Sequence, residues 1–294
     1  MKTAAPGLFL ENIPLAPYTT FGVGGPAALF ASINSLAEMQ QALAFCSENG
    51  IPFIVLGKGS NCLFDDRGFQ GAVLLNKLNT LEDDGNGCFT VGSGYSFARL
   101  GSGTARKGWS GLEFASGIPG TMGGAVYMNA GANGSDTASI LTEVLYLHAD
   151  GAIQKYERND LQFAYRHSPF QNMQGAILQA KVQLTACAEA KSKQHTMLAY
   201  RTSTQPYGEK SAGCVFRNPE GTSAGALIDH CGLKGITQGG AVISPQHANF
   251  IVNQGGATAQ DILGLMQIIR TTIRDKVGID LVSEICYIPY QREE

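Results

Sequence analysis

The sequence lacks several features that would place it in a specialised class of protein. No apolar run approaches the roughly 18 residues of a membrane span, and the first residues lack the apolar core of a secretory signal peptide. Lysine and arginine form no basic run or tail, and the formal net charge is −3. We therefore expect a soluble, cytoplasmic protein whose partners are small molecules and neither nucleic acid nor a membrane. We also expect a monomer.

The cysteines lack the spacing of a metal site or a disulfide framework. There are seven of them, scattered along the chain without a C-x-x-C pair. A structural zinc site uses paired ligand spacing, so no metal is expected. We expect reduced thiols, most of them acting as small core residues.

The composition allows a buried core, because hydrophobic residues make up 44% of the chain and charged residues 15%. The length suits two or three subdomains. Two capping-box patterns, Ser35–Glu38 and Thr258–Asp261, predict helices that end at Gly50 and Gly278.

Helices and strands are mixed along the chain without an internal repeat, so the predicted fold class is α+β. Asp150-Gly151 has the signature of a β-hairpin turn. Further helices are predicted at 96–107, 188–201 and 224–230. Apolar runs predict strands at 53–56, 72–75, 89–91, 144–147, 176–184 and 281–289, and residues 82–87 predict a polar turn.

The most informative segment is the glycine-rich stretch 108–134, GWSGLEFASGIPGTMGGAVYMNAGANG. Its glycines are interleaved with apolar residues such as Phe114, Met122 and Val126, which a disordered linker would not contain. Glycine is used where the backbone turns sharply or approaches something closely. We interpret the stretch as an ordered segment lying against a large flat ligand, with a simple turn between strands as the alternative.

A second glycine-rich loop, 57–61, directly follows the predicted strand 53–56. Such a loop can present backbone N–H groups to a phosphate. It is not a P-loop, because Gly59 follows Lys58, and it is not a Rossmann fingerprint, because the G-x-G-x-x-G pattern fails at Cys62. The loop therefore predicts a pyrophosphate contact or a plain turn.

Together these motifs resemble the UDP-N-acetylenolpyruvoylglucosamine reductase family, and the resemblance runs nearly end to end. The blocks that carry it are TTFGVGGP at 19–26, LGKGSN at 56–61, SGLEFASGIPGTMGGAVYMNAGA at 110–132, YRHS at 165–168, SAGCVFRNP at 211–219, HANFIVN at 247–253, and Glu284. The last domain is compact, as in the shorter form of the family.

The resemblance implies a two-lobed, PCMH/vanillyl-alcohol-oxidase-like FAD-binding domain and a C-terminal α+β substrate-binding domain. The expected boundaries are 1–75 for the first FAD-binding lobe, 76–187 for the second, 188–202 for a linking helix and 203–294 for the substrate-binding domain. Non-covalent FAD would contact Gly57, Lys58, Gly59, Ser60, Asn61, Gly117, Ile118, Pro119, Gly120, Thr121, Gly123, Gly124, Ala125, Asn129 and Gly131.

The resemblance also implies the reaction. In this family NADPH reduces the flavin, hydride then passes to the methylene carbon of UDP-N-acetylglucosamine enolpyruvate, and a protein acid protonates the adjacent carbon. The product is UDP-N-acetylmuramate, a peptidoglycan precursor.

The catalytic residues carried over from the family are Arg166, Cys214 and Glu284. Arg166 suits the substrate carboxylate, because its guanidinium is planar and permanently charged. Glu284 would donate a hydrogen bond to the developing charge if it holds a proton. Cys214 stands where the family usually has serine as proton donor, and a thiol is a far stronger acid than an alcohol.

Arg217 and Asn218 would lie near the substrate diphosphate, and Gln205 near another substrate contact. His247 and Asn249 are assigned to packing and hydrogen bonding. One alternative is an FAD oxidase of the same fold, although no histidine that could tether the flavin lies in 57–61 or 108–134. A non-catalytic flavin- or nucleotide-sugar-binding protein is a second alternative, and a Cys–His hydrolase using Cys214 lacks an evident partner.

Overall fold

The structure is a computed structural model that describes residues 7–291. The chain divides into two compact units. Unit 1 comprises Met1–Glu11, Leu29–Lys58 and Gly71–Tyr200, and unit 2 comprises Asn12–Ala28, Gly59–Gln70 and Arg201–Glu294. Each unit therefore collects segments that are far apart in the sequence.

The first sheet has the strand order β1-β2-β5-β3, formed by Leu10–Pro14, Pro26–Ile33, Phe69–Asn76 and Phe53–Leu56. Helix α1 (Leu36–Glu48) connects β2 to β3, and its N-cap Ser35 accepts a hydrogen bond from the Glu38 amide at 3.2 Å. The buried face of α1 (Met39, Ala42, Leu43, Cys46) packs in one cluster with residues of β2 and β5. This cluster is one of the two cores of unit 1.

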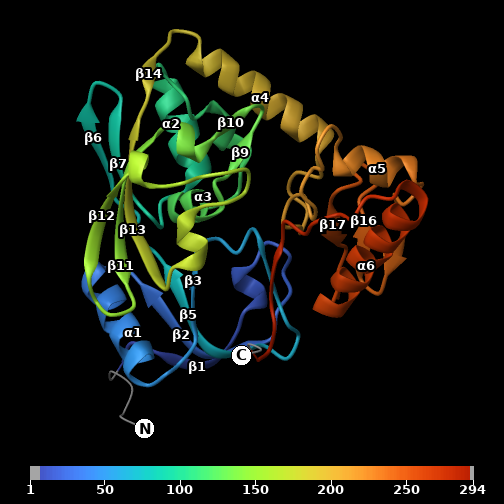
Figure 1. The fold of residues 1–294 in the computed structure, drawn as a ribbon, viewed down its shortest axis with the longest axis horizontal. Helices are drawn as coiled ribbons and strands as arrows, with labels where there is room; N and C mark the ends of the chain where they lie inside the picture. The colour runs from blue at the N-terminus through green and yellow to red at the C-terminus, as the bar shows by residue number, and fades with distance from the viewer. Residues whose placement is uncertain (1–6, 292–294) are drawn as a thin grey trace. The chain divides into compact units, whose positions relative to one another are not determined.

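Another sheet lies wholly within unit 1, is antiparallel and has the order β12-β11-β13-β7-β6. Helices α2 (Phe97–Arg106) and α3 (Met122–Met128) lie beside it in Figure 1, and α3 contacts β13 and β7. The second core fills the space between them. The strands are β6 (Leu81–Gly85), β7 (Cys88–Gly92), β11 (Leu141–His148), β12 (Ile153–Glu157) and β13 (Gly175–Gln183).

Short elements complete unit 1. Strand β8 (Trp109–Ser110) pairs with β14 (Thr185–Ala186), and β9 (Gly131–Ala132) pairs with β10 (Ser135–Asp136). Helix α4 (Ala190–Thr204) then leads the chain from unit 1 into unit 2. The 3-10 helix η2 (Glu113–Gly117) is buried throughout.

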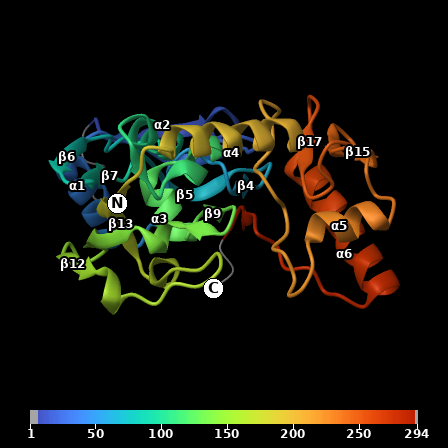
Figure 2. The same cartoon turned by 90° about the horizontal axis from the view of Figure 1, so that it is seen from above.

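Unit 2 is built on an antiparallel sheet of β15 (Thr237–Gln238), β16 (Ala241–Ile243) and β17 (Ile251–Asn253). Helices α5 (Ala224–His230) and α6 (Ala259–Val277) share its core, and Figure 2 shows them with β15 and β17 in orange and red. A separate parallel pair joins β4 (Cys62–Phe64) to β18 (Cys286–Ile288).

Most predicted elements are confirmed. The Thr258–Asp261 capping box is present, and α6 is followed by Gly278 at φ 74°. The hairpin at Asp150-Gly151 joins β11 to β12.

In the described part of the chain, no helix is long and apolar enough to cross a membrane.

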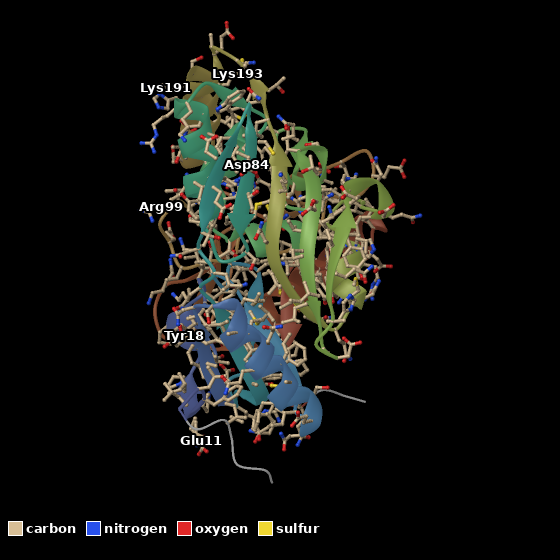
Figure 3. The ribbon with its side chains drawn as sticks, turned by 90° about the vertical axis from the view of Figure 1, so that its left-hand side faces the viewer. Glu11, Tyr18, Asp84, Arg99, Lys191 and Lys193 are labelled. Carbon is tan, nitrogen blue, oxygen red and sulfur yellow. The ribbon has the colours of Figure 1, made fainter. Side chains whose placement is uncertain are left out.

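Two local predictions are wrong in part, because only Asn86-Gly87 of the predicted turn 82–87 and only Cys286–Ile288 of the predicted strand 281–289 are confirmed. Residues 82–85 form most of the exposed strand β6 and not a turn, because backbone pairing with β7 stabilises a polar edge strand. Asp84, labelled in Figure 3, lies on this strand, accepts a hydrogen bond from Thr90 at 2.6 Å and pairs with Lys181 at 3.4 Å. The predicted strand 281–289 shortens to β18, since its first half makes only the isolated bridge Phe216↔Ser283.

Candidate active site

The two glycine-rich motifs meet inside unit 1. Gly57 follows β3, and Thr121 is the N-cap of α3, where its hydroxyl accepts a hydrogen bond from the Gly124 amide at 3.3 Å. A Cβ atom on Gly57 would collide with the Thr121 side chain, so only glycine permits this approach. Two motifs assigned to one cofactor from the sequence therefore lie against each other.

The protein's own packing explains several glycines of these motifs. The Gly123 amide donates to the Ser93 carbonyl at 2.8 Å, and a Cβ atom on Gly123 would lie 2.8 Å from the Ser93 Cβ. A Cβ atom on Gly131 would collide with the Ser135 carbonyl across the β9–β10 hairpin. The fold requires glycine at both positions whether or not a ligand is bound.

Gly124 is different, because nothing in the described chain requires glycine there. It is exposed on the first turn of α3, and a Cβ atom would meet only the Thr121 hydroxyl oxygen, at 3.5 Å. Alanine is favoured over glycine in a helix by about 0.5–1 kcal/mol. The fold therefore leaves the backbone open at this position, which suits the close approach of a ligand.

The loop after β3 presents unused hydrogen-bond donors. Within the described residues, the backbone N–H groups of Gly57, Lys58, Gly59 and Ser60 donate no hydrogen bond. Gly59 has φ 61°, and its carbonyl accepts a hydrogen bond from the Thr20 amide at 3.2 Å within unit 2. Consecutive unpaired N–H groups of this kind suit a phosphate.

A buried hydroxyl next to the glycine-rich stretch also lacks a partner. Ser116 is 7% exposed, and its Oγ makes no hydrogen bond in the described structure. Buried polar groups are normally paired, so this atom suits a ligand bound beside it. Within unit 1, the exposed backbone of Gly124, the amides of Gly57 and Lys58 and Ser116 Oγ are each of a kind that FAD would contact. Ser116 was not among the residues predicted from the sequence, although it directly precedes the predicted Gly117.

The remaining predicted cofactor residues are held in place by the protein. Gly117 ends η2, the Ile118 amide donates to the Ala115 carbonyl at 2.9 Å, and Pro119 follows. Gly120 accepts a hydrogen bond from the Phe97 amide at 3.1 Å, and Ala125 is buried in α3. Their contacts with FAD remain predictions.

Asn129 has a structural role at the end of α3. It adopts a left-handed conformation with φ 43°, and its side-chain amide donates to Asp136 at 3.0 Å and to the Ala164 carbonyl at 2.9 Å. Its side-chain oxygen accepts from the Ala138 amide at 3.0 Å. Asn129 thereby ties α3 to the turn that carries Arg166, and its contact with FAD stays a prediction.

Arg166 occupies a strained turn in unit 1. Ala164 and His167 exchange two backbone hydrogen bonds at 3.1 and 3.0 Å, and Arg166 within this turn has φ 56°. Left-handed backbone costs a non-glycine residue roughly 1–2 kcal/mol and clusters at functional sites. The guanidinium lies 4.9 Å from the centre of the Tyr165 ring and donates to the Gly131 carbonyl at 3.1 Å.

Cys214 and Glu284 lie on neighbouring segments of unit 2. The Glu284 amide donates to the carbonyl of Val215, the residue after Cys214, at 2.9 Å. Asn61, the last residue of the GKGSN loop, donates its side-chain amide to the Glu284 carbonyl at 3.0 Å. The structure thus brings together Cys214, Glu284 and Asn61, which are far apart in the sequence, whereas Arg166 belongs to unit 1.

Asn249 fixes the segment that carries Cys214. It is 1% exposed, and its side chain accepts from the Phe216 amide at 3.0 Å and donates to the Phe216 carbonyl at 2.8 Å. The Asn249 amide donates to His247 Nδ1 at 3.3 Å, and burial lowers the pKa of His247. These contacts agree with the packing roles expected for both residues.

Arg217 is the second residue with an unpaired buried atom. Its Nε is buried and makes no hydrogen bond within the described residues, although its backbone amide donates to the Val282 carbonyl at 2.9 Å. Asn218 accepts a hydrogen bond from the Ala224 amide at 3.1 Å, at the start of α5. Gln205 lies just after α4, where its carbonyl accepts from the Tyr207 amide at 2.7 Å. An unsatisfied guanidinium nitrogen suits an anionic ligand.

Comparisons with known proteins match both parts of the chain. Residues 205–288 match the family "UDP-N-acetylenolpyruvoylglucosamine reductase, C-terminal domain", and residues 27–157 match "FAD binding domain". The UDP-N-acetylenolpyruvoylglucosamine reductase of Protochlamydia amoebophila is 53% identical, covering 97% of this chain and 95% of the relative. The enzyme of the same name from Chlamydia pneumoniae is 47% identical, covering 99% and 97%.

A solved structure agrees with these relatives. The crystal structure of UDP-N-acetylenolpyruvylglucosamine reductase from Thermus caldophilus superposes with a TM-score of 0.83 at 37% identity. The match covers 96% of this chain and 100% of that structure. Sequence and fold therefore point to the same relatives.

Proposed function

The chain belongs to the UDP-N-acetylenolpyruvoylglucosamine reductase family, and on that premise we propose which of its residues carry out the reaction. It is an FAD-containing oxidoreductase that uses NADPH to reduce the enolpyruvyl group of UDP-N-acetylglucosamine enolpyruvate in peptidoglycan precursor synthesis. The relatives matched over nearly the whole chain do not favour the oxidase alternative.

The glycine-rich segments hold the cofactor. Bound there, FAD would supply hydride-transfer chemistry between NADPH and the enolpyruvyl group. The N–H groups of Gly57–Ser60 would hold its pyrophosphate, and the exposed backbone at Gly124 would leave room for its ring system. Ser116 Oγ supplies a further hydrogen bond.

Arg166 orients the substrate carboxylate. Charge develops on this carboxylate when hydride arrives at the neighbouring double bond, so a fixed cation stabilises the transition state more than the ground state. The strained φ of 56° and the Gly131 contact support this role, because they hold the guanidinium in one place at an energetic cost.

Cys214 donates the proton that completes the reduction, and Glu284 hydrogen-bonds to the developing charge. The observation that carries this pairing is the 2.9 Å hydrogen bond from the Glu284 amide to the Val215 carbonyl, which fixes the two segments side by side. Asn249 supports this geometry, because its side chain hydrogen-bonds to both the backbone N–H and the backbone carbonyl of Phe216. The Cys214 thiol delivers its proton to the carbon next to the carboxylate.

Arg217, Asn218 and Gln205 bind the nucleotide portion of the substrate. Burial of the unpaired Arg217 Nε supports this assignment, since a diphosphate would provide its missing acceptor.

The protein acts as a monomer in the cytoplasm, where NADPH and nucleotide sugars are available. Sedimentation of the FAD-loaded protein tests the monomer assignment.

The role of Cys214 can be tested by separating the two halves of the reaction. In anaerobic stopped-flow experiments, Cys214→Ala should be reduced by NADPH at the wild-type rate. Its reoxidation by substrate should slow by about 10²–10⁴-fold, the usual contribution of a general acid. Cys214→Ser serves as the matched control and should restore reoxidation. Wild-type reoxidation in Cys214→Ala would remove Cys214 from the mechanism.

A further inference from the structure

Two cysteines outside the catalytic assignments face each other across a strand pair in unit 2. Strands β4 and β18 are parallel, and their register aligns Cys62 with Cys286. Aligned residues on neighbouring strands project from the same face of a sheet. All seven cysteines are thiols in the structure.

The spacing of the strands is compatible with a disulfide. Neighbouring strands lie about 4.8 Å apart, and disulfides join Cα atoms about 4.4–6.8 Å apart. The Cβ atoms in a disulfide are only about 3.5–4.5 Å apart, so bond formation would draw β18 toward β4. The bond would therefore be strained, and strained disulfides are the readily reduced ones.

The two thiols differ in accessibility. Cys286 is exposed, whereas Cys62 is partly buried. The pKa of Cys62 is raised to about 12, mainly by burial and to a smaller extent by the neighbouring Cys286 thiol. Cys286 is therefore the thiol that an oxidant reaches first, and Cys62 is the one positioned to resolve the product.

The strand pair is tied directly to the proposed active site. The Cys286 amide donates to the Asn61 carbonyl at 3.0 Å, and the Asn61 side chain donates to the Glu284 carbonyl at 3.0 Å. Ser283, Ile285 and Tyr287 all line one pocket next to α6. Because side chains alternate along an extended segment, Glu284 and Cys286 project from the side opposite this pocket. Movement of β18 toward β4 would displace the backbone of Glu284.

We propose that Cys62 and Cys286 form a reversible disulfide when the protein meets a hydroperoxide, and that this bond slows reduction of the substrate. The Cys286 thiolate attacks the peroxide oxygen, giving a sulfenic acid and releasing hydroxide, which becomes water. The Cys62 thiol then displaces the sulfenic hydroxyl as a second water. In sum, two thiols and one hydrogen peroxide give one disulfide and two waters. The effect on turnover rests on the proposed role of Glu284, whereas formation of the bond does not.

The bond can be detected without measuring activity. The FAD-loaded protein is treated with hydrogen peroxide, blocked with N-ethylmaleimide in denaturant and digested with trypsin without reduction. We expect peptides 59–67 and 277–292 to appear linked, two hydrogen atoms lighter than their sum, and to separate on reduction with dithiothreitol. Cys286→Ser should abolish the linked species, while Cys231→Ser, a partly buried cysteine of the same unit, should retain it.

The effect on turnover is read from the same samples. In the oxidised protein, flavin reoxidation by substrate should slow about 10- to 100-fold, the scale expected for a misplacement of about 1 Å in a catalytic group. Reduction by NADPH should be unchanged, and dithiothreitol should restore the substrate step. Peptide 211–217, which carries Cys214, must remain alkylated, because this excludes oxidation of Cys214. In peroxide-treated Cys286→Ser, any slowing of the substrate step measures damage at other residues.

Each result decides part of the proposal. A Cys286 sulfenic acid trapped by dimedone without the linked peptide would overturn the disulfide. The linked peptide with an unchanged substrate step would overturn its effect on catalysis. A slow substrate step in untreated protein would instead point to a failure of the proposed function.

Discussion

Replacing Gly124 with alanine separates what the fold needs from what the cofactor needs. The fold has room for this methyl group, because the nearest atom is the Thr121 hydroxyl oxygen at 3.5 Å from a built Cβ. Gly124 is exposed on α3, so the methyl would project to the side on which we place FAD. Stability of the apoprotein and affinity for FAD should therefore change in opposite directions.

The magnitudes follow from the local structure. Alanine in place of an exposed helical glycine should stabilise the apoprotein by about 0.5–1 kcal/mol. For a chain of this size the thermal midpoint should rise by about 1–4 °C. A methyl group forced into a packed contact costs about 1–3 kcal/mol, so affinity for FAD should fall roughly 5- to 150-fold.

The assay uses protein stripped of FAD. Thermal unfolding of the apoprotein gives the stability change, and titration with FAD, followed by the change in flavin fluorescence, gives the dissociation constant. Gly123→Ala is the matched control, because its Cβ would lie 2.8 Å from the Ser93 Cβ. That variant should lower apoprotein stability by about 1–3 kcal/mol. If Gly124→Ala binds FAD as tightly as the wild type, α3 does not lie along the cofactor.

Three further variants test other parts of the molecule. Arg166→Gly should leave the unfolding free energy unchanged or raise it by about 1 kcal/mol, because glycine tolerates φ 56°, while kcat/KM falls; a lower thermal midpoint would contradict the strain argument. Arg217→Ala should raise KM for the substrate without slowing NADPH oxidation in the first half-reaction, and an unchanged KM would remove it from the substrate site. Hydrogen bonds from Arg67, together with one from Tyr287, hold the pKa of Asp65 well below its usual range. The stabilisation that ionised Asp65 gives the folded state should therefore be complete above its pKa in the unfolded chain, near pH 4, and be lost as the pH falls further. In denaturant titrations, Asp65→Asn should reduce the fall in unfolding free energy over this acid range.

Local signals in the sequence were sufficient for most helices. Ser35 and Thr258 cap α1 and α6 as predicted, because capping depends only on residues within one turn. Strand β6 was missed because its residues are polar and exposed, and its pairing with β7 is what makes it a strand. The partner strand follows directly in the chain, but β6 is stabilised by cross-strand backbone hydrogen bonds and not by apolar alternation, so hydrophobic periodicity does not reveal it.

The candidate site, like the fold, could be predicted from the sequence only in part. The glycine-rich motifs were recognisable, but the sequence does not distinguish Gly57 and Gly123, which packing requires, from Gly124, which it does not. The hydrogen bond that joins Glu284 to Val215 connects segments about seventy residues apart, so only the fold reveals it. The unpaired Arg217 Nε is likewise visible only once burial is known.

The most direct test of the central claim is the anaerobic absorbance of the purified protein in the flavin band. NADPH is added first, and UDP-N-acetylglucosamine enolpyruvate is added after the absorbance has settled. We predict that NADPH bleaches the band and that only the enolpyruvyl substrate restores it. A protein that bleaches but does not recover with this substrate, or that binds no FAD, would contradict the account.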